Sequence, residues 1–432
     1  MKTLCYVPFL AITLAACGSG GSQSSTTAPV VPPTNQGPAN QSPSITSAAN
    51  ISIDEYQTGK IYTMTAEDSD GQIADLALAS TADAAFFTFD AATGVIFLSS
   101  PLTTPQDLGA NNVYDLTLTA TDDDGASTSA SLAITVTDAG PPPSTSFDLL
   151  DWKLDLPIND EGEFTGLSTK IDEDDLADGY ESQFFYTGFD GGIVMRSPSQ
   201  GAKTSVNTSY TRTELREMLR RGNSNISTRG SNDEPNLNNW AFSSAPQQAQ
   251  DQAGGVDGTL CVTLAVNEVT TTGQNFEVGR LIIGQIHAVD DEPIRLYYRK
   301  LPGNEKGSIY AAHELSGGDD SYFNLIGSRD NDQSNPAEGF TLNETFSYVI
   351  DAKGNELDVE VLQNGVLIAE TTIDMSGSGY DVLNDFMYFK AGVYHVNNDA
   401  DTDEAAQITL YQLENNHDGY GFNTASCSAA TP

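Results

Sequence analysis

The most constraining feature of this sequence is the polar and apolar alternation of residues 387–397, MYFKAGVYHVN. A repeat of two residues is typical of a β-strand whose two faces meet different surroundings. In an extended chain one face carries Tyr388, Lys390, Gly392 and Tyr394. The other face carries Phe389, Ala391 and Val393. The pattern predicts a strand that packs on a core with one face and forms the floor of a polar cleft with the other.

Two further segments have the same arrangement. In residues 281–287, LIIGQIH, an extended chain places Gln285 and His287 on one face and Ile286 on the other. In residues 210–217, YTRTELRE, an extended chain groups Arg212, Glu214 and Arg216 on one face. The charge spacing of TELREMLRR fits a solvent-exposed helix with i,i+4 ion pairs equally well. Strand and helix therefore both remain open for this third segment.

Taken together, the motifs RTELR at 212–216, QIH at 285–287 and YFKAGVY at 388–394 resemble the signature regions of the alginate lyases of polysaccharide lyase family seven. The resemblance begins near Phe147, in FDLLDWKLDLP, and extends to the C-terminus. It implies an all-β fold for residues 147–432, a β-jelly roll or concanavalin-like sandwich. It also implies that a concave sheet binds alginate or a related polyuronate and cleaves it by β-elimination, without a cofactor or metal.

The resemblance implies four catalytic residues: Arg212, Gln285, His287 and Tyr394. Arg212 and Gln285 would hydrogen-bond the uronate carboxylate, because the C5 proton is poorly acidic while that group is ionised. His287 and Tyr394 are the candidates for base and acid. Four further residues are expected to bind substrate: Glu214, Arg216, Tyr388 and Lys390.

Stereochemistry divides the roles of His287 and Tyr394. In mannuronate the C5 proton and O4 lie on the same side, so one tyrosine can serve both. In guluronate they lie on opposite faces, which requires His287 as base and Tyr394 as acid. Within the family, isoleucine in the middle of Q-x-H accompanies activity on guluronate-containing blocks, and this chain has Ile286. The alternatives are a lyase on another polyuronate such as glucuronan, or a non-catalytic uronate-binding surface lipoprotein.

The charge distribution fits a polyanionic substrate only locally. The chain has 60 acidic and 19 basic residues, a net charge of -41. Twelve of the basic residues lie between Arg196 and Lys306, which predicts a positive cleft inside an acidic surface. Nucleic acid is excluded as a partner, because its binding needs a broad basic surface.

Three histidines have no catalytic motif around them and are expected to be structural or on the surface: His313, His395 and His417.

The N-terminus predicts export. Lys2 precedes an apolar run over residues 4–16 that is shorter than the roughly 20 residues of a membrane span and ends in LAAC. Residues 1–17 resemble a bacterial lipoprotein signal, in which Cys17 is lipidated. An ordinary signal peptide is the alternative. Gly18 after Cys17 favours the outer membrane or cell surface of a Gram-negative bacterium. In that oxidising setting we expect Cys261 and Cys427 to form a disulfide bond.

Composition divides the rest of the chain. Residues 18–44 are uncharged and rich in Ser, Pro and Gln, which predicts a flexible linker. Residues 45–139 alternate short strands with aspartate-rich turns and resemble a cadherin-like, immunoglobulin-sized β-sandwich. Its aspartates are expected to be solvated turn residues rather than calcium ligands: Asp68, Asp70, Asp122 and Asp124. Residues 140–146, GPPPSTS, form a Pro-rich linker, and we expect a monomer.

Overall fold

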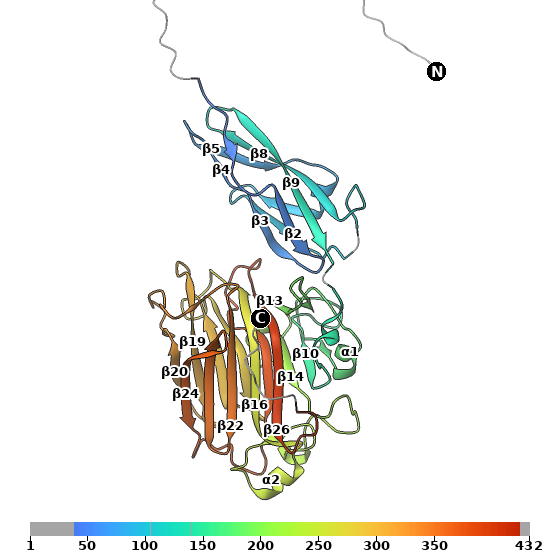
Figure 1. Cartoon of the computed structure of the whole chain (residues 1–432), viewed down its shortest axis with the longest axis vertical. Helices are drawn as coiled ribbons and strands as arrows, with labels where there is room; N and C mark the ends of the chain where they lie inside the picture. Colours follow the sequence, from blue (N-terminus) through green and yellow to red (C-terminus); the bar gives the residue numbers. More distant parts are fainter. Residues whose placement is uncertain (1–38, 104, 139, 424–432) are drawn as a thin grey trace, which may run out of the picture.

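The computed structural model describes residues 39–103, 105–138 and 140–423. The predicted signal peptide with Cys17, most of the predicted linker and Cys427 lie outside these residues. The described chain forms two β-rich domains, one above the other in Figure 1. Its α-helices are short: α1 (Glu173–Ala177) and α2 (Gln247–Gln252). In the part of the chain that the structure describes, no helix is long and apolar enough to cross a membrane.

The N-terminal domain has its own sheets and core. One sheet has the order β2 (Asn50–Asp54), β9 (Ser127–Thr137), β8 (Val113–Asp122), β5 (Ile73–Leu78). A second has the order β3 (Gly59–Thr63), β7 (Val95–Leu98), β6 (Phe87–Asp90), and β1 (Ser44–Ile45) pairs with β4 (Ala66–Glu67). A 3-10 helix, η1 (Asp83–Phe86), precedes β6. The core takes alternate residues of β8, among them Tyr114, Leu116 and Leu118. The predicted strand content is confirmed, and the cadherin-like assignment stays a prediction.

The C-terminal domain is a jelly roll of two large sheets. The nine-stranded sheet has the order β11 (Lys170–Ile171), β10 (Trp152–Asp155), β14 (Thr211–Glu217), β25 (Tyr388–His395), β17 (Arg280–His287), β18 (Ile294–Arg299), β19 (Lys306–Glu314), β20 (Asp320–Ile326), with β21 (Phe340–Thr341) on β19. The eight-stranded sheet has the order β12 (Phe185–Thr187), β13 (Ile193–Pro198), β26 (Ala405–Asp418), β16 (Gly255–Glu268), β22 (Thr345–Lys353), β23 (Glu356–Gln363), β24 (Val366–Asp374), with β15 (Trp240–Ala241) on β16. Two 3-10 helices lie outside the sheets, η2 (Pro143–Thr145) and η3 (Ser231–Asp233).

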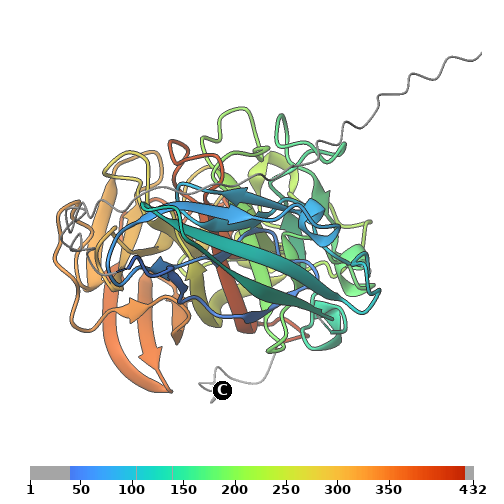
Figure 2. The same cartoon turned by 90° about the horizontal axis from the view of Figure 1, so that it is seen from above.

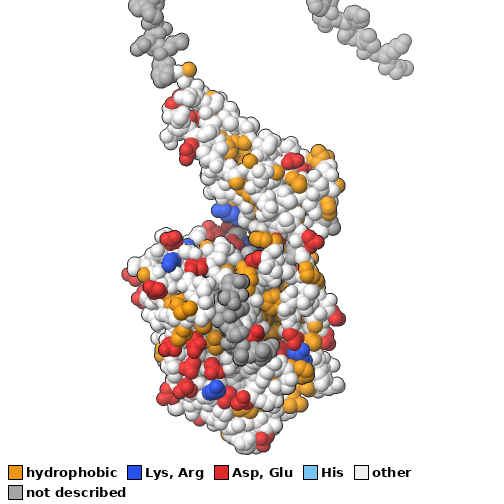
Figure 3. All heavy atoms as spheres, viewed as in Figure 1, with side chains coloured by type: hydrophobic (Ala, Val, Ile, Leu, Met, Phe, Trp, Pro, Cys, Tyr) orange, Lys and Arg blue, Asp and Glu red, His pale blue; other side chains and the backbone are white. Residues whose placement is uncertain are grey.

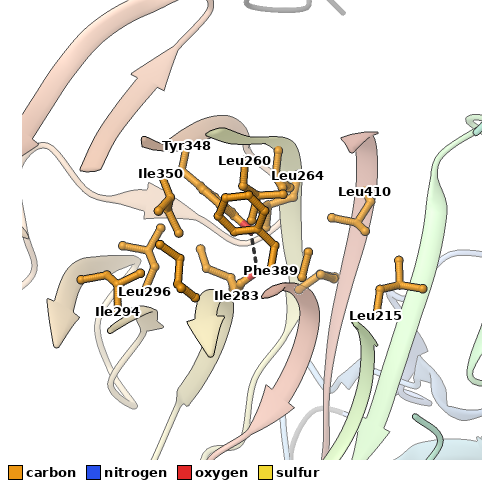
Figure 4. Packing of buried hydrophobic residues seen from close by; sticks show 14 of the residues in the cluster. Leu215, Leu260, Leu264, Ile283, Ile294, Leu296, Tyr348, Ile350, Phe389 and Leu410 are labelled. Carbon is orange, nitrogen blue, oxygen red and sulfur yellow. Dashed lines mark hydrogen bonds between the residues drawn. The ribbon is translucent and has the colours of Figure 1, made fainter. Parts of the chain in front are cut away.

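The main core fills the space between these two sheets (Figure 4). Phe389 and Ile283 of the nine-stranded sheet meet Leu264 and Tyr348 of the other sheet, and full burial of each such side chain contributes about 1.5–3 kcal/mol. The Tyr348 hydroxyl donates to the Ile283 carbonyl at 2.8 Å. This tyrosine fits because Gly284 has no side chain, since a Cβ there would lie 2.4 Å from the Tyr348 hydroxyl.

The sheet order brings the three sequence motifs side by side. Strand β25 lies between β14 and β17, with Arg212 opposite Tyr394 and His287 opposite Tyr388. The helical alternative for the RTELR segment is therefore wrong. Propensity could not decide between strand and helix there, because pairing with β25, far away in the sequence, sets the conformation. The apolar face of β25 is buried in the core, as its alternation predicts.

The remaining histidines and Cys261 are buried structural residues. His313 contacts the Pro293 carbonyl at 2.7 Å, and His417 contacts Glu217 at 2.8 Å. His395 is also buried, so the structural expectation for all three histidines is confirmed. Cys261 is disulfide-bonded, and its pairing with Cys427 stays a prediction because Cys427 lies outside the described residues.

The two domains touch each other directly, and the view from above in Figure 2 shows the N-terminal domain over the ends of the jelly-roll strands. The rings of Tyr56 and Tyr186 lie 5.4 Å apart between centroids. Arg196 of β13 reaches Gly59 of β3, where a Cβ would lie 2.6 Å from the guanidinium. The Pro-rich linker therefore joins domains that share a packed contact.

Candidate active site

A cleft of about 510 Å³ lies on the outer face of the nine-stranded sheet. Strands β10, β14, β17 and β25 form its floor, and the segment 204–210 borders it. Six lysines and arginines line it: Lys153, Lys170, Arg212, Arg216, Arg229 and Lys390. Three carboxylates do so: Asp155, Asp290 and Glu292. Basic groups thus outnumber acidic ones here, whereas the whole chain has three times more acidic than basic residues.

The charge contrast continues on the rest of the surface. The face seen in Figure 3 has many acidic side chains and few basic ones. Acidic residues gather over β22–β24, where Glu356 and Asp374 are exposed. A positive cleft in such a surface attracts a polyanion locally while the shell keeps the protein soluble. The predicted basic cleft is therefore present, although Lys153, Lys170 and Lys390 come from outside the basic segment 196–306.

Sheet register aligns the cationic side chains in a row across the strands. Lys153 of β10 lies opposite Arg216 of β14, which lies opposite Lys390 of β25. Lys390 in turn lies opposite Gln285 of β17. Neighbouring strands are about 4.8 Å apart, so this row presents charges at a spacing comparable to a sugar unit of a polymer. The row suits a chain of carboxylates better than a single small anion.

Glu214 is buried under the side chains that line the cleft and holds this arrangement together. Its carboxylate accepts hydrogen bonds from Arg212 Nη1 at 2.9 Å, from Lys390 Nζ and from Gln285 Nε2. Only 1% of Glu214 and 1% of Gln285 is exposed, and neither lines the cleft. We therefore assign Glu214 a positioning role in place of the expected direct contact with substrate. A direct contact of Gln285 with substrate stays a prediction.

Burial and the neighbouring charges set the pKa values of Arg212 and Lys390. Burial lowers the pKa of Arg212, but Glu214, Tyr394 and Asp155 together outweigh burial and raise it, so the guanidinium stays charged. Burial and the nearby Arg212 lower the pKa of Lys390. Within the described structure the buried Arg212 Nε has no hydrogen-bond partner, which is unusual for a buried donor.

Tyr394 lies next to Arg212 at one end of the cleft. The guanidinium carbon is 3.6 Å from the centre of the Tyr394 ring, and the Tyr210 ring lies 6.1 Å away edge-on. Burial raises the pKa of Tyr394, and Arg212 offsets this only in part. The phenol is therefore protonated near neutral pH, which suits a proton donor better than a base.

His287 is held in one tautomer. Its Nδ1 lies 2.6 Å from the Ala288 carbonyl, which can only accept, so Nδ1 donates and Nε2 carries the lone pair. The ring stacks on Tyr388 with centroids 5.0 Å apart, and the Arg216 guanidinium lies 3.9 Å from the centre of the Tyr388 ring. Burial and the charge of Lys390 hold the pKa of His287 well below its usual range. The imidazole is thus neutral and able to accept a proton.

The structure brings most of the predicted site residues together in one cleft, and their roles stay predictions. Six of the eight predicted residues line it: Arg212, Arg216, His287, Tyr388, Lys390 and Tyr394. Sequence reasoning missed Lys153, Tyr210 and Glu292. The alternation of WKLD was a usable signal for Lys153, because it predicts that Lys153 and Asp155 share a face with the neighbouring motif. Glu292 lies in a loop before β18 and has no such signal.

In the ranges that the structure covers, no group of three or more His, Cys, Asp or Glu side chains is arranged to hold a metal ion. Asp122 accepts from the Asp124 and Ala126 amides, and Asp70 accepts from the Gln41 amide. The expectation of a solvated side chain is wrong for Asp122, which is 2% exposed because its carboxylate is turned into its own turn, and both carboxylate oxygens of Asp68 are also buried.

Comparison with known proteins identifies the C-terminal domain. The family model described as alginate lyase matches residues 147–417. An alginate lyase from Klebsiella pneumoniae is 49% identical over 289 residues, which are 65% of this chain and 92% of that protein. The crystal structure of the alginate lyase from Klebsiella pneumoniae aligns with a TM-score of 0.62 and 47% identity, covering 64% of this chain and 99% of that chain. The matched region contains every strand of the cleft floor.

Proposed function

This chain belongs to the alginate lyase family and is an alginate lyase, and we propose that it cleaves guluronate-containing blocks by β-elimination. The observation that carries the proposal is that a histidine and a tyrosine, His287 and Tyr394, line the same cleft. His287 is neutral with its Nε2 lone pair available, and Tyr394 is protonated. Two groups with opposite tasks are what a sugar with its C5 proton and O4 on opposite faces requires.

The reaction begins with neutralisation of the uronate carboxylate. Arg212 and Lys390 face the cleft and supply positive charge where the enolate-like charge develops. His287 Nε2 then takes the C5 proton. As the C4–O4 bond breaks, its electron pair goes to O4 and the Tyr394 hydroxyl donates a proton there. Glu214 keeps both cations in place throughout, since it contacts each of them directly.

A panel of homopolymers tests the block preference. The mature chain is incubated with polyguluronate, polymannuronate, mixed alginate and glucuronan, and the ultraviolet absorbance of the unsaturated uronate is followed. We expect the highest kcat/KM on polyguluronate or mixed alginate. A higher value on polymannuronate would refute the preference, and product from glucuronan alone would refute alginate as the substrate. The family membership already disfavours a glucuronan lyase and a non-catalytic binder.

We further propose that the enzyme is lipid-anchored through Cys17 at the outer membrane or cell surface, with the N-terminal domain as a spacer. The support is the LAAC sequence ending at Cys17. Cys17→Ser should block processing and release the protein from membranes, whereas the wild type should resist salt washing and yield to detergent. Unchanged processing and fractionation of Cys17→Ser would overturn the anchor.

A further inference from the structure

The catalytic histidine has a carboxylate neighbour that the reaction described above does not use. Glu292, in the loop between β17 and β18, places its Oε1 3.4 Å from His287 Nε2. Both side chains line the cleft, and about one fifth of each is exposed. Nδ1 of His287 is occupied by the Ala288 carbonyl, so Nε2 is the one nitrogen through which this ring can gain and lose a proton.

From this contact we propose that Glu292 is the proton relay of His287, accepting from Nε2 the proton abstracted at C5 and passing it to water. The proposal rests on the proposed function. The proton moves from C5 to Nε2 while the C5 electron pair forms the C4–C5 double bond. It then moves to a Glu292 oxygen, which leaves Nε2 free for the next sugar. Tyr394 gives one proton to O4 and regains one from water, so the cycle is balanced.

The surroundings of Glu292 suit a group that alternates between two protonation states. Charged or titratable groups face it from four strands: His287 of β17, Arg295 of β18, Glu314 of β19 and Lys390 of β25. Arg295 Nη1 lies 3.8 Å from Glu292 Oε2, and Arg295 is shared with Glu314 and with Asp320 of β20. Arg295 and Lys390 favour the ionised form, and Glu314 opposes it.

The balance of these effects places the proton affinity of Glu292 near neutrality. Burial, followed by the carboxylate of Glu314, raises the pKa of Glu292 to about 7 despite Arg295 and Lys390. A carboxylate with an ordinary pKa would be a weaker acceptor for the proton on an imidazolium. A neutral imidazole and a Glu292 carboxyl with a pKa near 7 can exchange one proton readily.

Glu292→Gln removes the acceptor with little change in shape. On polyguluronate we expect kcat to fall about 10-fold or more while KM changes little. The acid limb of the wild-type kcat profile, where Glu292 becomes protonated as pH falls through about 7, should disappear. Glu292→Asp keeps a carboxylate and should retain an acid limb. Polymannuronate cleavage, in which Tyr394 can serve as both base and acid, should fall less.

Glu314→Gln is the matched control. It removes a carboxylate from the same Arg295 cluster, at 3.3 Å from Arg295 Nη2, and should keep an acid limb that is displaced to lower pH, because Glu314 no longer raises the pKa of Glu292. The proposal is overturned if Glu292→Gln keeps the acid limb and kcat of the wild type, or if Glu314→Gln removes the limb equally. Failure of the wild type to release unsaturated product from alginate would instead refute the proposed function. Tryptophan fluorescence verifies folding of each variant, because both tryptophans, Trp152 and Trp240, are buried in the jelly-roll core.

Discussion

Replacement of Glu214 by glutamine tests whether one buried carboxylate organises the cleft floor. The variant leaves Arg212 and Lys390, both buried, without the ion partner that they share. Loss of one member of a buried ion pair costs about 3–5 kcal/mol. Lys390 has a lowered pKa and can release its proton, which relieves part of this cost. We therefore expect the lower end, about 3 kcal/mol.

The assay is thermal or urea unfolding followed by tryptophan fluorescence, which reports on the jelly roll alone. A loss of about 3 kcal/mol corresponds to a decrease in Tm of roughly 5 °C for a domain of this size. Asp233→Asn is the control, because its pair with Arg229 is 3.7 Å long and about half exposed, and should cost less than about 1 kcal/mol. Equal stability losses in the two variants would refute the organising role of Glu214.

Three further predictions concern pH, packing and metals. Burial and Arg216 lower the pKa of Lys153 to about 8, so Lys153 is charged below that pH and neutral above it. The KM for alginate should therefore rise as the pH increases through about 8. Lys153→Arg stays charged and should flatten that rise, and an identical rise in this variant would contradict the role of Lys153. Gly284→Ala should destabilise the jelly roll by about 1–3 kcal/mol, because the new Cβ meets the Tyr348 hydroxyl. Adding Tyr348→Phe to the same chain removes that hydroxyl and should restore part of the lost stability. Chelation should leave alginate cleavage by the full chain unchanged, since Arg212 and Lys390 supply the positive charge, and loss of activity restored by a divalent cation would oppose this mechanism.

The sequence predicted the fold where a local pattern and the tertiary environment agree. The alternation of β25 predicted which face is buried, because a strand between a core and a cleft imposes a period of two. The RTELR segment was ambiguous, since only its pairing with β25 distinguishes a strand from a helix. Motif resemblance located Glu214 and Gln285. It did not predict that both are buried under the side chains that line the cleft, because this burial depends on contacts across three strands.

Long-range geometry also explains what sequence reasoning missed. The basic segment 196–306 contributes to the cleft, yet several of its arginines bind acidic side chains elsewhere; Arg220, for example, binds Glu173 at 2.6 Å. Glu292 lies in a loop, where no periodicity indicates the direction of a side chain, and only its distance from His287 shows its relevance. The distribution of basic residues along the chain therefore predicted that the cleft is positively charged, but not which residues form it.

The most direct test of the proposed chemistry is the steady-state rate of Tyr394→Phe on polyguluronate, measured by absorbance of the unsaturated product. The change removes one hydroxyl and leaves the ring beside Arg212, so KM or the affinity for oligoguluronate should be nearly unchanged. With Tyr394 as the acid that protonates O4, kcat should fall by about 10²–10⁴-fold. Retention of most of the wild-type kcat would contradict the role of Tyr394 and with it the division of labour between Tyr394 and His287.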